Sequence, residues 1–166
     1  MDLEQRVAEL ERRMAELEGV ERPAPAVAEG DFWALEGLKA QLAGLQAADG
    51  GVLYTGAVRL PTGERYEWQT GALADDLFDR DWSETADSFA ALGHPVRLRL
   101  LREILGGRRT AASLAELEET GTTGQIYHHL RQLTGAGWLH TTGRGRYEVP
   151  AGRVVPLLVM LSAAQP

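Results

Sequence analysis

Residues 92–150 hold two helix signals separated by a short turn, followed by a Gly/Arg-rich hairpin, and this order constrains the fold most. Thr110 is suited to cap the first helix, which we expect to end near Gly121. The second helix opens at Thr122. Its hydroxyl and the Gln125 side chain, three residues on, are spaced as a capping box.

The second helix has one apolar side and one polar side. Ile126, Leu130 and Leu133 recur at i, i+4 and i+7, which predicts an inward stripe. The opposite side has no aliphatic side chain and is rich in hydrogen-bond donors and acceptors, as a helix that reads base edges must be. It carries Gly124, His128, Arg131 and Gln132, flanked by Gln125 and Tyr127.

Two short strand-like runs follow the second helix, at 138–142 and 146–149, and a glycine-flanked tip joins them. Arg144 and Arg146, at the tip, are placed to contact phosphate or to enter a minor groove. Helix, turn, helix and hairpin in this order are typical of a winged helix-turn-helix. The alternative is a small helical domain whose surface is polar and whose hairpin only closes the core.

Residues 91–101, ALGHPVRLRLL, resemble the opening of the winged-helix domain of ArsR/SmtB-type bacterial regulators. Tyr127-His128-His129-Leu130, with Leu133, Ala136 and Gly137 after it, is similar to their recognition helix and its exit. The resemblance runs from about Ser83 to Ala164. It implies a dimeric transcriptional regulator, usually a repressor that an effector releases. By position, it implies base reading by Thr123, Gln125, Tyr127 and His128, and wing contacts by Arg144 and Arg146.

The chain departs from the metal-sensing members of that family. Those members carry Cys pairs in the first helix of the helix-turn-helix, or Asp, His and Glu ligands in the C-terminal helix. This chain has no Cys, and its stretch from Arg153 to Ala164 has no His, Asp or Glu. We therefore expect no metal site and no cofactor, and an effector that is not a metal. A metal-responsive sensor is the alternative.

The net charge of −7 is unevenly distributed along the chain. Residues 1–93 hold 8 Lys and Arg against 19 Asp and Glu, a net charge of −11. Residues 94–153 hold 9 Arg against 5 Glu, a net charge of +4. The positive stretch contains the predicted helix-turn-helix and wing, and local positive charge is what DNA affinity requires.

The first 18 residues show a heptad pattern, with Val7 and Met14 at a positions and Leu3, Leu10 and Leu17 at d positions. Arg6 and Arg13 then fall opposite Glu11 and Glu18 of a parallel partner. We expect residues 1–18 to form a coiled coil in a homodimer, or else an amphipathic helix folded on its own chain. Residues 19–30, with Pro23 and Pro25, are a predicted linker.

Residues 31–82 are expected to form a helix from Asp31 to about Ala48, packed on a hairpin that turns at Leu60-Pro61-Thr62-Gly63. Ser83 is expected to cap the helix 84–92 that follows. Three of the four Trp lie between Phe32 and Trp82. The aromatic residues of this segment line a pocket for a small organic effector against the helix, join hairpin to helix, or form a surface for a partner protein. The candidate effector-binding residues are Tyr54, Tyr66, Trp68 and Trp82.

The sequence as a whole predicts a mainly α protein with small β hairpins that binds an inverted-repeat DNA duplex as a homodimer. Residues 83–166 form the predicted DNA-binding domain with its C-terminal dimerisation helix. The sequence has no GxSxG motif, no phosphate-binding glycine loop followed by Lys and no HExxH motif, so we expect no enzyme. The sequence has no apolar leader and no apolar run long enough to cross a membrane, so we expect a cytoplasmic protein. The remaining alternatives are a protein-interaction module on a winged-helix scaffold and a small-molecule or metal binding protein with no regulatory role. The predicted DNA-binding residues are Thr122, Thr123, Gln125, Tyr127, His128, Arg131, Gln132, Arg144 and Arg146.

Overall fold

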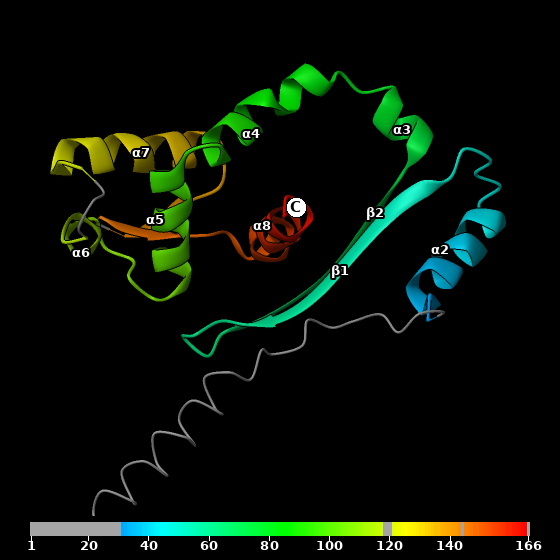
Figure 1. The fold of residues 1–166 in the computed structure, drawn as a ribbon, viewed down its shortest axis with the longest axis horizontal. Helices are drawn as coiled ribbons and strands as arrows, with labels where there is room; N and C mark the ends of the chain where they lie inside the picture. Colours follow the sequence, from blue (N-terminus) through cyan, green and yellow to red (C-terminus); the bar gives the residue numbers. More distant parts are fainter. Residues whose placement is uncertain (1–30, 118–120, 144, 166) are drawn as a thin grey trace, which may run out of the picture. The chain divides into compact units, whose positions relative to one another are not determined.

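The computed structural model describes residues 31–117, 121–143 and 145–165, and the predicted coiled coil and linker lie outside these residues. The described residues are mainly helical with two antiparallel hairpins, as predicted (Figure 1). Residues 38–166 form one compact unit. In chain order the elements are α2 (Trp33–Gly44), β1 (Gly51–Arg59), β2 (Arg65–Leu73), α3 (Ala74–Phe78), a 3-10 turn η1 (Trp82–Thr85), α4 (Ala86–Leu92), α5 (Pro95–Leu105), α6 (Ala111–Ala115), α7 (Thr123–Gly135), β3 (His140–Gly143), β4 (Arg146–Glu148) and α8 (Ala151–Ala163).

The first hairpin forms where the alternation of apolar and polar residues and the Pro61–Gly63 turn predicted it. β1 and β2 pair along their whole length, from Gly51 opposite Leu73 to Arg59 opposite Arg65. The turn is closed by two backbone hydrogen bonds, from Gly63 N to Leu60 O at 2.9 Å and from Leu60 N to Glu64 O at 2.8 Å. Gly63 has φ +90°, a conformation that glycine adopts at no steric cost.

One face of this hairpin lies against α8 rather than α2. Tyr54, Gly56 and Val58 oppose Thr70, Trp68 and Tyr66, so all six residues share that face. A Cβ added to Gly56 would lie 2.6 Å from Val155 Cγ1, and one added to Gly152 would lie 3.5 Å from the Trp68 ring.

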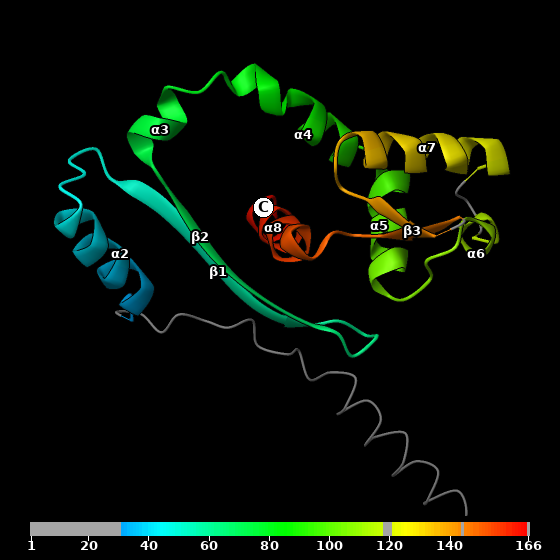
Figure 2. The same cartoon turned by 180° about the vertical axis from the view of Figure 1, so that it is seen from behind.

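α8 takes this place because it is apolar on more than one side. Val154, Val155 and Leu157 are all buried, and a helix that is apolar nearly all round needs partners on two sides. Figures 1 and 2 show α8 with the hairpin on one side and α5 on the other.

Several element boundaries differ from those predicted. The first helix of the helix-turn-helix, α6, ends at Ala115 rather than near Gly121. α2 ends at Gly44 rather than near Ala48, and Gln46 just beyond it has φ +56°. The helix predicted from residue 84 starts only at Ala86, after the 3-10 turn. The side chain that caps this turn belongs to Asp81, whose Oδ1 accepts a 2.9 Å hydrogen bond from Ser83 N, so Ser83 is not the cap.

The main core lies between the helices of residues 91–157 and includes the tip of the first hairpin. The predicted stripe of α7 is confirmed, since Ile126, Leu130 and Leu133 are fully buried. They pack with residues of α5, α6 and α8, with Trp138, and with Leu60 of the hairpin turn. The indole of Trp138 also donates a 3.1 Å hydrogen bond to Ser88 O. The hairpin and the helices that follow it therefore share one core.

The apolar helices of the described residues are short. None of them has the length and continuous hydropathy needed to cross a lipid bilayer.

Candidate nucleic-acid interface

The N-terminus of α7 has the predicted capping box. Gln125 N donates to Thr122 Oγ1 at 3.3 Å, and Thr122 N donates to Gln125 Oε1 at 2.7 Å. The Gln125 carboxamide oxygen is therefore engaged in the cap, and its NH2 group is the part that remains for a further hydrogen bond.

Helical winding gives α7 distinct sides around its buried stripe. Gly124 and His128 lie on the side opposite the stripe. Tyr127 and Arg131 lie on the side that faces the second hairpin, since both line a hollow shared with that hairpin. Gln132 lies on the other flank, toward α4 and α5.

The predicted reading residues of α7 are exposed together. They form one continuous polar surface at the start and along the outer half of the helix. These exposed residues are Thr122, Thr123, Gln125, Tyr127, His128, Arg131 and Gln132.

Arg97 holds one edge of this surface in place, and no pattern in the sequence indicated a role for it. Its guanidinium donates to Gln132 Oε1 on α7, and to Ala91 O and, at 2.7 Å, Ala90 O at the end of α4. Arg97 is 35 residues from Gln132, so no local spacing in the sequence reveals the pair. The contact joins α4, α5 and α7, and it engages the side-chain oxygen of Gln132.

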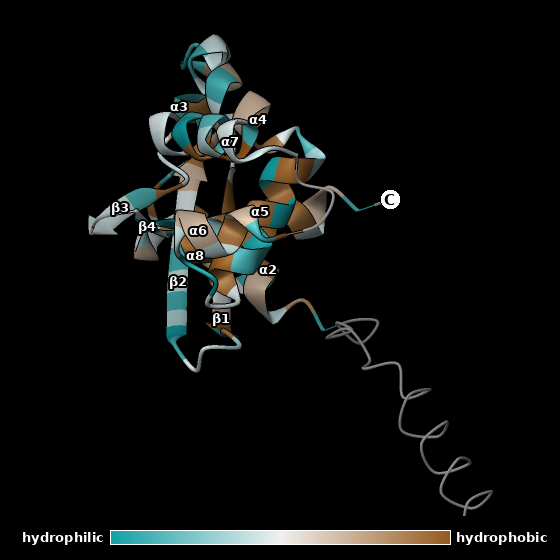
Figure 3. Cartoon of the chain, turned by 90° about the vertical axis from the view of Figure 1, so that its left-hand side faces the viewer, coloured by the Kyte–Doolittle hydropathy of each residue, from teal (hydrophilic) through white to brown (hydrophobic). Residues whose placement is uncertain are grey.

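The second hairpin forms the predicted wing. His140 pairs with Glu148 and Thr141 with Tyr147, and the register shifts between Thr141 and Gly143. β3 starts at His140 rather than Trp138, because Trp138 and Leu139 are buried in the core. Figure 3 shows β3 in the teal and white of polar residues. Arg146 is exposed, with its Nε 3.8 Å from Glu148 Oε1, and Arg144 lies outside the described residues.

A network of charges connects the base of the wing with the turn of the first hairpin. Arg109, whose side chain is only 14% exposed, pairs with Glu148 of β4 at 3.1 Å and with Glu64 of the turn. Hydrogen bonds from Thr62, at 2.7 Å, and from Arg109 lower the pKa of the Glu64 carboxyl. The bond to Glu64 in turn raises the pKa of Arg109. The three charges come from separate segments, so sequence reasoning did not connect them.

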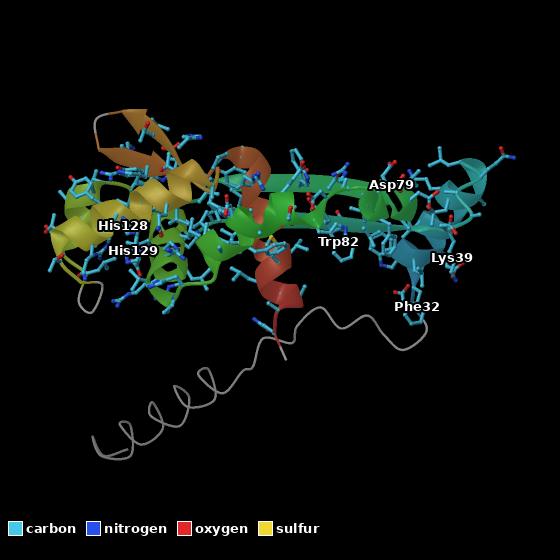
Figure 4. The ribbon with its side chains drawn as sticks, turned by 90° about the horizontal axis from the view of Figure 1, so that it is seen from above. Phe32, Lys39, Asp79, Trp82, His128 and His129 are labelled. Atoms are coloured by element: carbon cyan, nitrogen blue, oxygen red, sulfur yellow. The ribbon has the colours of Figure 1, made fainter. Side chains whose placement is uncertain are left out.

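Two histidines meet where α5 packs on α7. His94 is the N-cap of α5, with its Nδ1 accepting from Val96 N at 3.2 Å. The centre of its ring lies 4.7 Å from that of His129, and the centre of the His128 ring lies 5.9 Å from that of His129. Figure 4 shows His128 and His129 close together on α7. His129 Nδ1 is buried without a hydrogen-bond partner among the described residues. Within the same residues, no group of three or more His, Asp or Glu side chains is arranged to hold a metal ion.

The environment of His129 predicts a loss of stability in mild acid. Burial lowers its pKa from the ordinary value of 6.5, and His94, Arg97 and His128 lower it further. The unfolded chain therefore takes up a proton at higher pH than the folded chain does. We expect the contribution of neutral His129 to the free energy of unfolding to be complete above about pH 6.5. It is lost as the pH falls through the pKa of His129 in the folded chain.

Chemical denaturation at about pH 7.5 and about pH 5.5 measures this loss. His129→Gln should show a smaller difference in unfolding free energy between the two values than the wild type shows. The control is His140→Gln, which removes an exposed histidine outside the cluster and should keep the wild-type difference. Equal differences for His129→Gln and the wild type would contradict the prediction.

The four aromatic residues predicted to bind an effector lie in two separate parts of the structure. Tyr54, Tyr66 and Trp68 lie on the hairpin face that meets α8. Trp82 lies at the start of η1 and is 64% exposed, and its Nε1 donates to Leu77 O at 2.8 Å. Figure 4 shows Trp82 well apart from His128 and His129. A separate hollow of about 420 Å³, on the α2 side of the hairpin, is lined by residues such as Leu38, Leu42 and Leu53.

A family model described as a helix-turn-helix domain matches residues 92–141. The match starts at the end of α4, covers α5, α6 and α7, and ends in β3. No curated protein and no solved structure matches the chain. The matched segment holds the exposed face of α7 and its capping box. The chain therefore carries a helix-turn-helix domain, which indicates a DNA-binding regulatory protein.

Proposed function

We propose that this chain is a sequence-specific transcriptional regulator of the ArsR type, a dimeric repressor that a non-metal effector releases from DNA. The outward face of α7 carries the proposal. It is exposed and polar, and it lies opposite a stripe that is fully buried. A helix held in this way presents donors and acceptors at a fixed orientation, which base reading requires.

In the proposed complex α7 enters the major groove and the wing contacts the neighbouring backbone or minor groove. His128 faces the base edges from the middle of the outward side. Gly124 precedes it by one turn, and the absence of a side chain there lets the helix backbone approach DNA closely. Thr122, Thr123 and Gln125 reach bases from the helix N-terminus, and Arg144 and Arg146 act from the wing.

The dimer is proposed to form through α8, α4 and the coiled coil of residues 1–18. Phe89 of α4 and Leu161 of α8 are exposed apolar side chains that a second copy would cover. Residues 19–30 serve as the linker to the region 31–82, and residues 83–166 form the DNA-binding domain. Two-fold symmetry of the dimer requires an inverted-repeat operator.

The effector is proposed to act on the region 31–82. Support comes from the Glu64–Arg109–Glu148 network, which joins the first hairpin to the base of the wing. A ligand that displaces the hairpin would also disturb the wing. It weakens DNA binding only by the difference between its affinities for the free and DNA-bound conformations.

Selection from a random pool of duplexes tests the proposal, followed by affinity measurements on the selected site. His128→Ala should weaken binding to the selected inverted repeat by about 1–3 kcal/mol and change binding to a scrambled duplex little. Because His128 is exposed, the variant should unfold like the wild type, which serves as the folding control. A wild-type chain that prefers no duplex would refute the proposal and favour a protein-interaction module.

A further inference from the structure

A hollow of about 370 Å³ separates α7 from the wing. It lies on one flank of α7, beside the outward side that carries His128. Both of its walls belong to elements placed against DNA under the proposed function, and the inference drawn here rests on that function. The lining residues are Tyr127, Arg131, Thr134 and Gly135 of α7, Thr141 of β3 and Tyr147 of β4.

The chemistry of the hollow is suited to an oxyanion. Its lining includes a guanidinium, two phenols and two hydroxyls, and it includes no carboxylate. The Thr134 hydroxyl donates to Leu130 O at 2.9 Å, so its proton is already used. The donors left for a ligand are Arg131, Tyr127, Tyr147 and Thr141.

Arg131 differs from the other arginines near the interface in having no hydrogen-bonding or ion-pair partner among the described residues. It is exposed and makes no hydrogen bond or ion pair with any residue that the structure describes. Arg97 is held by Gln132, Arg109 by two glutamates, and Arg146 lies beside Glu148. Arg131 can therefore bind an anion without first breaking a protein contact.

We propose that this hollow binds one phosphate of the DNA backbone, with Arg131 as its cation and the hydroxyls of Tyr127, Tyr147 and Thr141 as further donors. With α7 in the major groove, the DNA backbone that borders the groove passes between α7 and the wing. Phosphate contacts fix the register of a protein on the duplex without reading sequence. Arg131 and Tyr127 are then positioning residues, and base reading falls to His128 and the start of α7.

The salt dependence of DNA binding tests this assignment, measured on the selected inverted repeat and on a scrambled duplex. Arg131→Ala should weaken both by the same factor, roughly 10- to 100-fold, and reduce the slope of log K against log salt by about 0.9 for each bound protomer. Arg131→Lys should keep the slope because the charge remains. His128→Ala is the matched variant on the same helix, and it should act on the selected duplex alone.

Replacement of single backbone phosphates by neutral methylphosphonate locates the contact. The wild type should lose affinity at one position in each half-site, and Arg131→Ala should lose nothing further there. Tyr147→Phe should weaken both duplexes equally, with a smaller change than Arg131→Ala.

Three results would overturn the phosphate site. One is a loss in Arg131→Ala that is confined to the selected duplex, as expected of a base reader. Another is that the affinity losses caused by methylphosphonate and by Arg131→Ala are additive at every phosphate position. The third is saturable binding of inorganic phosphate to the free protein that Arg131→Ala abolishes, since that assigns the hollow to a small oxyanion. Failure of the proposed function itself is distinct, because the wild-type chain would then bind no duplex.

Discussion

Replacing Leu60 with Ala should lower the free energy of unfolding by about 2–5 kcal/mol, although Leu60 lies in the turn of a surface hairpin. Its side chain is only 8% exposed and belongs to the same core as Leu100, Ile104 and Leu114. Removing it leaves a cavity among side chains of the helix-turn-helix. Denaturant unfolding followed by Trp fluorescence measures the change.

The control for Leu60→Ala is Leu45→Ala, the same change at a side chain that is 65% exposed. It should alter the unfolding free energy by no more than about 0.5 kcal/mol. Because hairpin and helices share a core, residues 38–166 should unfold in one transition, and Leu60→Ala should shift all of it. A separate early transition for the hairpin would contradict the shared core.

Gly56→Ala should destabilise the protein by about 1–3 kcal/mol through a steric conflict between the first hairpin and α8. The added Cβ would lie 2.6 Å from Val155 Cγ1, closer than carbon atoms approach without movement. Val155→Ala removes the conflicting methyl groups. The destabilisation of the double variant should therefore be smaller than the sum of the two single destabilisations, by about 0.5–3 kcal/mol.

The matched control for Gly56→Ala is Gly143→Ala, a strand glycine of β3 whose added Cβ would meet nothing within 4 Å. It should have little effect on unfolding. Strictly additive effects of Gly56→Ala and Val155→Ala would show that the hairpin face does not rest on α8 at this point.

The candidate interface could be predicted from the sequence where its interactions are local. The Thr122–Gln125 capping box and the stripe of Ile126, Leu130 and Leu133 both join residues within one or two helical turns. Spacing along the chain is enough to identify such contacts, because backbone geometry fixes which residues of a helix or strand share a face. The turn of the first hairpin was predictable for the same reason.

The contacts that connect the elements were decided by the tertiary structure alone. The Arg97–Gln132 pair and the Arg109 network span 35 to 45 residues, and a single charged residue does not indicate its partner at that distance. The aromatic face of the hairpin was expected on helix 31–48 and lies on α8 instead. The sequence determines that this face must be covered, since apolar strand faces bury. Which helix covers it depends on how all the apolar surfaces pack at once, and among the described helices it is α8, apolar on more than one side, that lies against this face.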